Sequence, residues 1–185
     1  MKLIFLLEEL SAKETLNVLL PKILPKEVEF LCISHEGKSD LQRSIPIKLR
    51  NWQEPNVKFV IVHDKDSNDC IKLKAELKNI AKNCKREDAL VRIICSELES
   101  WFLGDLAAVE KSFGINLSEK KNKAIYRNPD NIQNAKQELR KLIPQYQQIS
   151  GSRKIASEMS LSDNKSRSFL VFIEGIMKVV KSSLA

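Results

Sequence analysis

The chain has 185 residues, of which 43% are hydrophobic and 30% charged, a composition typical of a folded domain and not of a disordered chain. At this length a single domain can bury a core of useful size. The apolar start, residues 3–7, runs directly into two glutamates and is too short for a signal segment. No stretch approaches the ~20 apolar residues of a membrane span. We therefore expect a cytoplasmic protein without a membrane partner.

The four cysteines form no CxxC pair and have no neighbouring histidine. In a chain of this kind we expect them to be reduced and structural, and we expect no zinc site.

The net charge of +7 is unevenly distributed along the chain. Residues 1–100 carry 17 Lys and Arg against 16 Asp and Glu, whereas residues 101–185 carry 14 against 8. A near-neutral front half and a basic back half suit a metal site next to a polyanion-binding surface. A solvated basic face explains the same charge equally well, so the charge alone leaves both interpretations open.

Short apolar runs alternate with helical periodicity along the first hundred residues. We predict strands at 2–7, 28–34, 57–63 and 89–95, and helices at about 12–20, 41–52, 73–84 and 98–113. Beyond residue 115 the sequence predicts loops and helices only, the last helix beginning near Arg167. The alternation indicates an α/β fold, with a four-stranded parallel sheet covered by helices and a mainly helical C-terminal part.

Local signals predict how these helices begin and end. Ser11 and Glu14 have the spacing of a capping box at the start of the first helix, and Pro21 and Pro25 are expected to end it. Gly114 is expected to stop the helix at 98–113. We expect residues 1–113 to form an α/β core that binds metal and residues 114–185 a basic helical extension packed on it, within one structural domain.

Acidic residues follow three of the four predicted strands. Glu8 follows the first strand, Asp64 and Asp66 the third, and Glu97 and Glu99 the fourth. The carboxyl edge of a parallel sheet is where such proteins bind ligands, and carboxylate oxygens are what Mg²⁺ and Mn²⁺ prefer. Without a cation, several carboxylates so close together would repel one another. The sequence therefore predicts an Mg²⁺ or Mn²⁺ site, although a lone DxD is also a common loop or helix-cap sequence.

The sequence around these acids resembles a known family. The segment EE-x-S-x-K-E follows the first strand, DxD the third and E-x-W the fourth, as in the Toprim fold. Within that fold the chain resembles a small family labelled as a domain of unknown function and related to the OLD and RloB nucleases. The resemblance covers nearly the whole chain. The stretches that carry it are HEGKSDL (35–41), DKDSNDC (64–70), ELESWFLGD (97–105) and NKSRSF (164–169).

The resemblance implies that the first and third strands are adjacent, which brings Glu8 beside Asp64 and Asp66. It also implies cleavage of phosphodiester bonds with Mg²⁺, with Glu99 and Trp101 as the E-x-W pair. The chain departs from the pattern at two positions. Glu9 replaces the usual glycine, and Ala12 stands where OLD-like nucleases often carry a second acid, so the number of metal ions stays open.

For such a nuclease the catalytic candidates are Glu8, Asp64, Asp66 and Glu99, together with two basic residues. Lys13, like Lys65, is a candidate for stabilising charge, and His35 is a candidate general base after the second strand. His63 is expected to point away from Asp64, by strand alternation. The nucleic-acid contacts are expected in the basic back half, at Lys123, Arg127, Arg153, Lys154, Lys165 and Arg167.

Two functions remain open at this point. The first is an Mg²⁺- or Mn²⁺-dependent nuclease acting on DNA, tRNA or another RNA. Because the resembling proteins are encoded beside ABC-type ATPases in anti-phage defence systems, we expect it to act as the effector subunit of such a system. The second is a non-catalytic subunit with a vestigial site that serves as a structural or regulatory partner of the ATPase. The sequence leaves the oligomeric state open, a homo-oligomer included.

Overall fold

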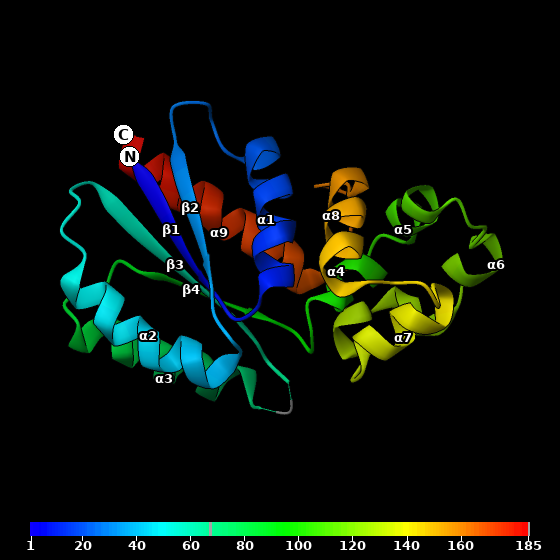
Figure 1. Cartoon of the computed structure of the whole chain (residues 1–185), viewed down its shortest axis with the longest axis horizontal. Helices are drawn as coiled ribbons and strands as arrows, with labels where there is room; N and C mark the ends of the chain where they lie inside the picture. Colours follow the sequence, from blue (N-terminus) through cyan, green and yellow to red (C-terminus); the bar gives the residue numbers. More distant parts are fainter. Residues whose placement is uncertain (67, 185) are drawn as a thin grey trace.

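The computed structural model describes residues 1–66 and 68–184. Its four strands form one parallel sheet in the order β2-β1-β3-β4 (Figure 1). The bounds are β1 (Lys2–Leu7), β2 (Glu29–Ser34), β3 (Val57–Asp64) and β4 (Leu90–Ile94). β1 pairs with β3 so that Leu7 lies opposite Val62, and β3 pairs with β4 so that Asp64 lies opposite Ile94. The predicted four-stranded parallel α/β fold is confirmed.

Helices cover both faces of the sheet. α2 (Lys38–Asn51) and α3 (Cys70–Asn83) lie on one face, and α1 (Leu10–Ile23) and α9 (Arg167–Leu184) lie on the other (Figure 1). Alternation along β1 explains the two cores, since Ile4 and Leu6 contact the α2–α3 side while Leu3, Phe5 and Leu7 contact the α1–α9 side. A central strand buried on both faces reads as an unbroken apolar run, and this is the sequence of β1.

The C-terminal part is helical, as predicted. Its shorter helices lie beside α1, next to the sheet (Figure 1). They are α4 (Glu99–Leu103), α5 (Leu106–Phe113), α6 (Ser118–Lys121), α7 (Ala135–Leu142) and α8 (Gln148–Glu158), with short 3-10 turns at Ala124–Arg127 and Pro129–Asn131. α8 packs along α1, where Lys22 donates to the carbonyl oxygens of Ala156 and Ser157. One apolar cluster runs from the sheet into these helices.

The predicted capping box of the first helix is wrong. α1 begins at Leu10, and the hydroxyl of Ser11 donates to the carboxylate of Glu9, 3.3 Å away, instead of accepting from the helix backbone. Glu14 accepts from Nε of Arg153 on α8, at 2.8 Å. The Glu14 carboxylate, which a capping box would bond to the start of the helix, therefore forms an ion pair with another helix instead.

Pro21 does not end the first helix, which continues to Ile23. A proline inside a helix removes one hydrogen bond, here to the carbonyl of Asn17, four residues earlier. Asn17 is exposed, so water can satisfy that carbonyl. Leu19, Leu20 and Ile23 are buried on the same helix, and their packing holds the last turn in place.

The helix predicted at 98–113 is two helices, α4 and α5. The break lies at Gly104 and Asp105, where the Asp105 carboxylate accepts from the N–H of Ala108 and so caps α5. Gly114 has a left-handed backbone (φ 62°) and ends α5 as predicted. Within the described chain, no helix combines the length and the apolarity that crossing a membrane requires.

Candidate functional site

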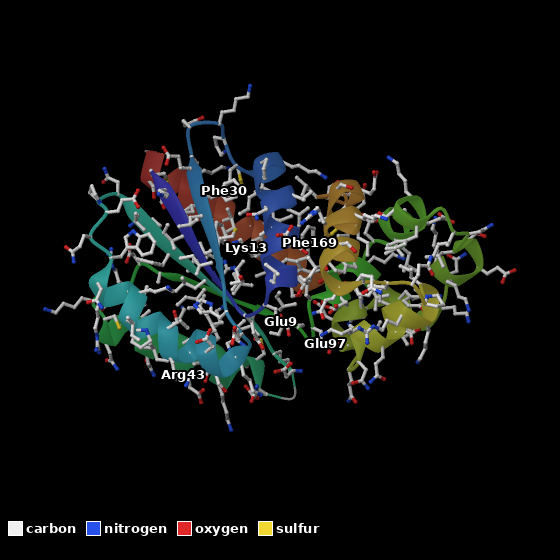
Figure 2. The ribbon with its side chains drawn as sticks, viewed as in Figure 1. Glu9, Lys13, Phe30, Arg43, Glu97 and Phe169 are labelled. Atoms are coloured by element: carbon white, nitrogen blue, oxygen red, sulfur yellow. The ribbon has the colours of Figure 1, made fainter. Side chains whose placement is uncertain are left out.

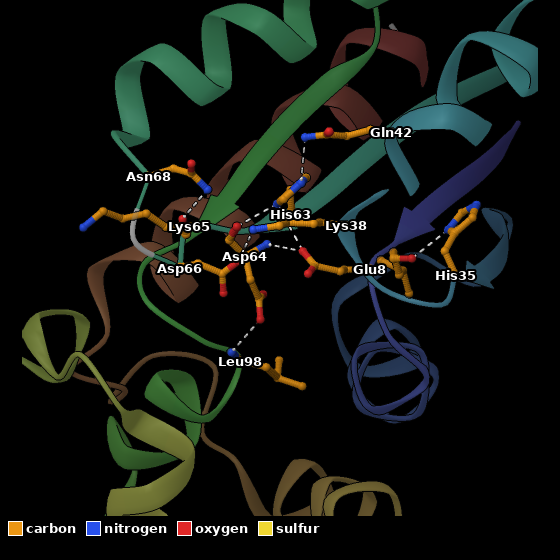
Figure 3. Close-up of polar contacts among 11 residues, drawn as sticks. Glu8, His35, Lys38, Gln42, His63, Asp64, Lys65, Asp66, Asn68 and Leu98 are labelled. Atoms are coloured by element: carbon orange, nitrogen blue, oxygen red, sulfur yellow. Dashed lines mark hydrogen bonds and ion pairs between the residues drawn. The ribbon is translucent and has the colours of Figure 1, made fainter. Parts of the chain in front are cut away.

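The acids that follow β1 and β3 lie side by side at the carboxyl edge of the sheet. Because Leu7 is paired with Val62, Glu8 lies beside His63 and Asp64. Oε2 of Glu8 accepts a hydrogen bond from the backbone N–H of Asp64 at 3.2 Å. Oδ2 of Asp64 accepts from the N–H of Leu98 at 3.3 Å, which connects the end of β3 to the segment after β4 (Figure 3).

The two acids after β4 connect the sheet to the helical part. Glu97 accepts from the backbone N–H of Lys136 at 2.8 Å, in the first turn of α7. Glu99 is 1% exposed and accepts from the hydroxyl of Tyr146 at 3.3 Å. Figure 2 shows Glu9 and Glu97 where the sheet meets the helical part. The site is therefore built between these two parts of the molecule.

The carboxylates are close enough to disfavour one another's ionisation. Burial raises the pKa of Asp64 well above its usual value, and the charges of Glu8, Glu99 and Glu9 raise it further. Burial also raises the pKa of Glu8, although the neighbouring His63 opposes this. The pKa of Glu99 is raised to about 7, mainly by burial. Ionising all of these carboxylates together would therefore cost much free energy, because they share a region of low dielectric.

Asp66 lies at the outer rim of the site. Its backbone has a positive φ of 49°, as does that of Ser96 (68°), and the N–H of Asp66 donates to the carbonyl of Ser96 at 3.1 Å. A left-handed backbone is strained for residues other than glycine and is concentrated at functional sites. Nζ of Lys38, the first residue of α2, is 3.7 Å from the carboxylate of Asp66. Ser67, which follows in the DKDSNDC motif, lies outside the described residues.

Two basic residues of the site were missed by sequence reasoning, His63 and Lys38. His63 is fully buried on the α2–α3 side of the sheet, and its Nδ1 is 3.1 Å from Oε2 of Glu8. Its partner follows from the register of β1 and β3, which the sequence does not give. Lys38 belongs to the HEGKSDL motif, so this motif was the available signal for it.

The other predicted catalytic residues lie apart from the carboxylates. Nδ1 and Nε2 of His35 are each 2.8 Å from a partner, the carbonyl of Leu7 and the hydroxyl of Ser44. The side chain of Lys65 extends away from Glu8 (Figure 3). Lys13 lies on α1, where its charge acts on the Cys32 thiol of β2, whose pKa burial raises to about 12.

The basic residues predicted to contact nucleic acid are spread over the C-terminal part. Arg153 is paired with Glu14, and Arg167 lies 3.5 Å from Glu174. Nζ of Lys154 lies 5.8 Å from the ring centre of Phe113. The others are Lys123, Arg127 and Lys165; the first two are exposed, and Lys165 lines a hollow beside Gly104 and Asp105.

The donor set suits a hard divalent cation. Glu8, Asp64, Asp66 and Glu99 offer carboxylate oxygens, which Mg²⁺ and Mn²⁺ prefer. Among the described residues, however, no group of three or more His, Cys, Asp or Glu side chains is arranged to hold a metal ion. Glu8 is turned towards His63 on one side of the sheet and Asp64 towards Leu98 on the other. The residues fit the ion by their chemistry, and binding requires these carboxylates to rotate towards one another.

Comparison with protein-family models assigns the chain to a family. Residues 7–177 match the model described as "Domain of unknown function (DUF4276)". The chain belongs to this family. Searches of curated proteins and of solved structures gave no match.

The DUF4276 match includes the whole candidate site. It begins at Leu7, one residue before Glu8, and extends into α9, whose last residue is Leu184. The prediction of a domain-of-unknown-function family is confirmed. The family description names no activity, so the function of this DUF4276 protein has to be inferred from its site.

Proposed function

We propose that this DUF4276 protein is an Mg²⁺- or Mn²⁺-dependent nuclease that hydrolyses phosphodiester bonds of DNA or RNA. The observation that carries the proposal is the crowding of Asp64 by Glu8, Glu9 and Glu99 at the carboxyl edge of a parallel sheet. Like charges gathered in a partly desolvated place raise the free energy of the folded chain, and a divalent cation would offset that cost. The resemblance of the same acids to the Toprim motifs supports this assignment.

In this proposal Glu8, Asp64 and Asp66 hold one ion, and Glu97 or Glu99 holds a second if two are bound. A bound ion would polarise the phosphate and lower the pKa of a water molecule. The protein's own contribution is positional. His63 fixes one oxygen of Glu8, and the N–H of Leu98 fixes one oxygen of Asp64. Lys38 lies at the rim, where its ammonium can balance phosphate charge.

The biological setting rests on the family resemblance alone. The related nucleases are linked to ABC-type ATPases of anti-phage systems, and we propose that this chain is the effector subunit of such a pair. Cleavage of DNA or RNA would then depend on the ATPase partner, and the purified chain would bind metal more readily than it cuts.

A second candidate function is a structural subunit with a vestigial site. The observation that favours it is the role of the acids after β4. Glu97 caps α7, and Glu99 is buried against Tyr146, so both hold the helical part to the sheet. Ala12 also stands where related nucleases often have an acid. In this case the carboxylates would serve assembly with the ATPase and not cleavage.

The proposal is tested by Mn²⁺ calorimetry on the wild type and on Asp64→Asn/Asp66→Asn, with cleavage of tRNA and plasmid DNA measured on the same preparations. Asp88→Asn is the matched control, because Asp88 lies at the opposite edge of the sheet, paired with Lys58. We expect the wild type and the control to bind Mn²⁺ and to cut, with the ATPase partner added where the chain alone does not cut, and the double variant to do neither.

Each other outcome has a definite meaning. Mn²⁺ binding without cleavage, in the chain alone and with its ATPase, supports the structural subunit. Absence of Mn²⁺ binding by the wild type contradicts the metal site and the nuclease with it.

A further inference from the structure

A dense positive charge lies on α2 and α3. Each of these helices carries four basic residues and one acidic residue, so the two together carry a net charge of +6. The basic residues are Lys38, Arg43, Lys48 and Arg50 on α2, and Lys72, Lys74, Lys78 and Lys82 on α3. The two helices lie side by side on one face of the sheet (Figure 1), so their charges belong to a single face, called the α2–α3 surface below.

Most of this charge is not neutralised by ion pairs. Among the described residues only Lys38 of the α2–α3 surface has an acidic partner, Asp66. Five basic residues of the C-terminal part, by contrast, are paired with glutamates. They are Lys111, Lys121, Lys141, Arg153 and Arg167. Residues 101–185 thus pair five of their 14 basic residues, whereas the α2–α3 surface pairs one of its eight among the described residues.

The arrangement on α3 costs stability. Lys74, Lys78 and Lys82 follow one another at four-residue spacing and share one side of the helix. Like charges at this spacing destabilise a helix, and Glu76 lies between the first two in sequence but forms no ion pair with either among the described residues. The opposite side of α3, with Leu73, Leu77 and Ala81, packs on the sheet. The lysine row is therefore a stripe of positive charge in which Lys78 and Lys82 are exposed and Lys74 is half-buried, with no ion pair among the described residues.

The α2–α3 surface begins at the candidate site. α2 starts at Lys38, whose ammonium lies near the carboxylate of Asp66. α3 starts at Cys70, directly after Asp69 and shortly after the DxD at residues 64–66. Because helices of a parallel α/β sheet run back from the carboxyl edge of the strands, both helices lead away from the carboxylates. Arg43 lies further along α2 (Figure 2). A polyanion that contacts these helices would have one of its phosphates close to the acids.

We propose that the α2–α3 surface binds the phosphodiester backbone of the nucleic-acid substrate and leads it to the carboxylates. The inference rests on the proposed function for the identity of the ligand, and it moves the main contact surface from the C-terminal part to these two helices. Lysine and arginine contacts to phosphates position a nucleic acid without reading its sequence. The surface therefore supplies affinity and orientation, and not sequence specificity.

The test compares two triple variants of equal charge. Lys74→Gln/Lys78→Gln/Lys82→Gln removes the stripe of α3, and Lys120→Gln/Lys123→Gln/Arg127→Gln removes three basic residues of the C-terminal part. In each triple two side chains are exposed and one is half-buried, and none has an ion-pair partner among the described residues. Anisotropy of labelled duplex DNA and of single-stranded RNA is measured in EDTA, between about 50 and 200 mM salt.

We expect the α3 triple to bind about tenfold more weakly or worse, and its salt slope on duplex DNA to fall by up to about 2.7, at about 0.9 per lost phosphate contact. The C-terminal triple should keep most of the affinity. Should the α3 triple fail to fold, Arg43→Gln/Arg50→Gln on α2 serves as its replacement. Unfolding temperatures verify folding, since loss of like-charge repulsion should not lower them.

Four results would overturn the proposal. The α3 triple could bind the nucleic-acid probes as tightly as the wild type, or the C-terminal triple could lose as much affinity for them or more. The wild type could also bind neither probe, or bind only to vesicles of phosphatidylserine. The assay contains no metal, so it is independent of catalysis. Nucleic-acid binding that depends on α3, without cleavage either alone or with the ATPase partner, would leave this inference standing and contradict the nuclease.

Discussion

His63 and Glu8 form a buried contact directly beneath the candidate site. Nδ1 of His63 is 3.1 Å from Oε2 of Glu8 and 2.6 Å from the carbonyl oxygen of Asp64. Its Nε2 lies 3.4 Å from the side-chain amide of Gln42, which can donate to it. A donor at Nε2 and two acceptors at Nδ1 favour the tautomer with its proton on Nδ1. His63 thus holds a carboxylate oxygen of Glu8 in a fixed direction.

Replacing His63 should weaken metal binding. Residues that orient a metal ligand typically change affinity by about 10–100-fold when mutated, and we expect His63→Ala to lower Mn²⁺ affinity in that range. Calorimetry provides the measurement. The matched control is His35→Ala, the other histidine of the chain, which bonds to Leu7 and Ser44 and not to a carboxylate. Equal Mn²⁺ affinity in His63→Ala and the wild type would rule out this positioning role.

Removing one of the crowded charges should stabilise the metal-free protein. Asp64→Asn keeps the shape of the side chain and deletes the charge that Glu8, Glu9 and Glu99 oppose. We expect about 1 kcal/mol of added stability in EDTA, or about 2–4 °C in unfolding temperature for a chain of this size.

With saturating Mn²⁺ the wild type should become more stable than Asp64→Asn. At a hundred times its dissociation constant a ligand adds about 2.7 kcal/mol to the protein that binds it, here the wild type but not Asp64→Asn. Thermal unfolding with and without Mn²⁺ tests both statements. A destabilised Asp64→Asn in EDTA would show that the acids do not repel one another as described.

The hydrogen bond between Tyr126 and Glu138 should make the stability of the folded protein depend on pH. The Tyr126 hydroxyl donates to the Glu138 carboxylate at 2.7 Å and is the main cause that lowers the pKa of Glu138. A lowered carboxyl pKa contributes stability above the unfolded value of 4.5, and this is lost as the pH falls through the folded pKa. Tyr126→Phe should therefore cost about 1.5–3 kcal/mol near neutral pH, and much less once the pH lies below the folded pKa of Glu138.

Urea denaturation over this pH range measures the effect of Tyr126→Phe. Lys141→Gln is a useful comparison, because it removes the exposed partner of the same carboxylate and should cost less than about 1 kcal/mol. A loss in Tyr126→Phe that is the same in acid as at neutral pH would mean that the bond does not depend on ionised Glu138.

Gly104 should tolerate no side chain. A β-carbon there would overlap Oδ1 of Asn164 and lie 2.9 Å from the backbone nitrogen of Ser166. Asn164 cannot easily move, since its amide donates to the carbonyl of Trp101 and its oxygen accepts from Ser166. We expect Gly104→Ala to lose about 1–3 kcal/mol by overpacking.

A double variant shows whether overlap with Asn164 causes the stability loss of Gly104→Ala. Asn164→Ala removes the closest atom, so Gly104→Ala/Asn164→Ala should lose less than the sum of the two single changes. Chemical denaturation of the four proteins gives the comparison. Strict additivity would indicate that Gly104 is required for its backbone and not for the close approach of Asn164.

Local pattern was enough to predict the frame of this fold and the place of its acids. The strand β1 is an apolar run buried on both faces, and helical periodicity separates it from the next strands. Because parallel strands end at the same edge, acids that follow strands in the sequence meet in space. Glu8 and Asp64 could be placed at the same edge for this reason, whereas the adjacency of their two strands was implied by the family resemblance.

Local motifs failed where distant segments compete for the same groups. The capping box at Ser11 and Glu14 is a local pattern, but Arg153, 139 residues away from Glu14, binds that carboxylate. Helix 98–113 breaks at Gly104, where Asn164 approaches closely. The propensities of short segments contain no information about such partners.

The sequence by itself determined the parallel sheet and the gathering of carboxylates at one edge, since periodicity and strand ends are properties of the chain. Only the tertiary structure decided that Glu8 faces His63, because this depends on the register of two strands far apart in the sequence. It also decided which basic residues remain unpaired. A charge counted along the sequence can be cancelled by a carboxylate from any other element, so the α2–α3 surface becomes visible only when the elements are packed together.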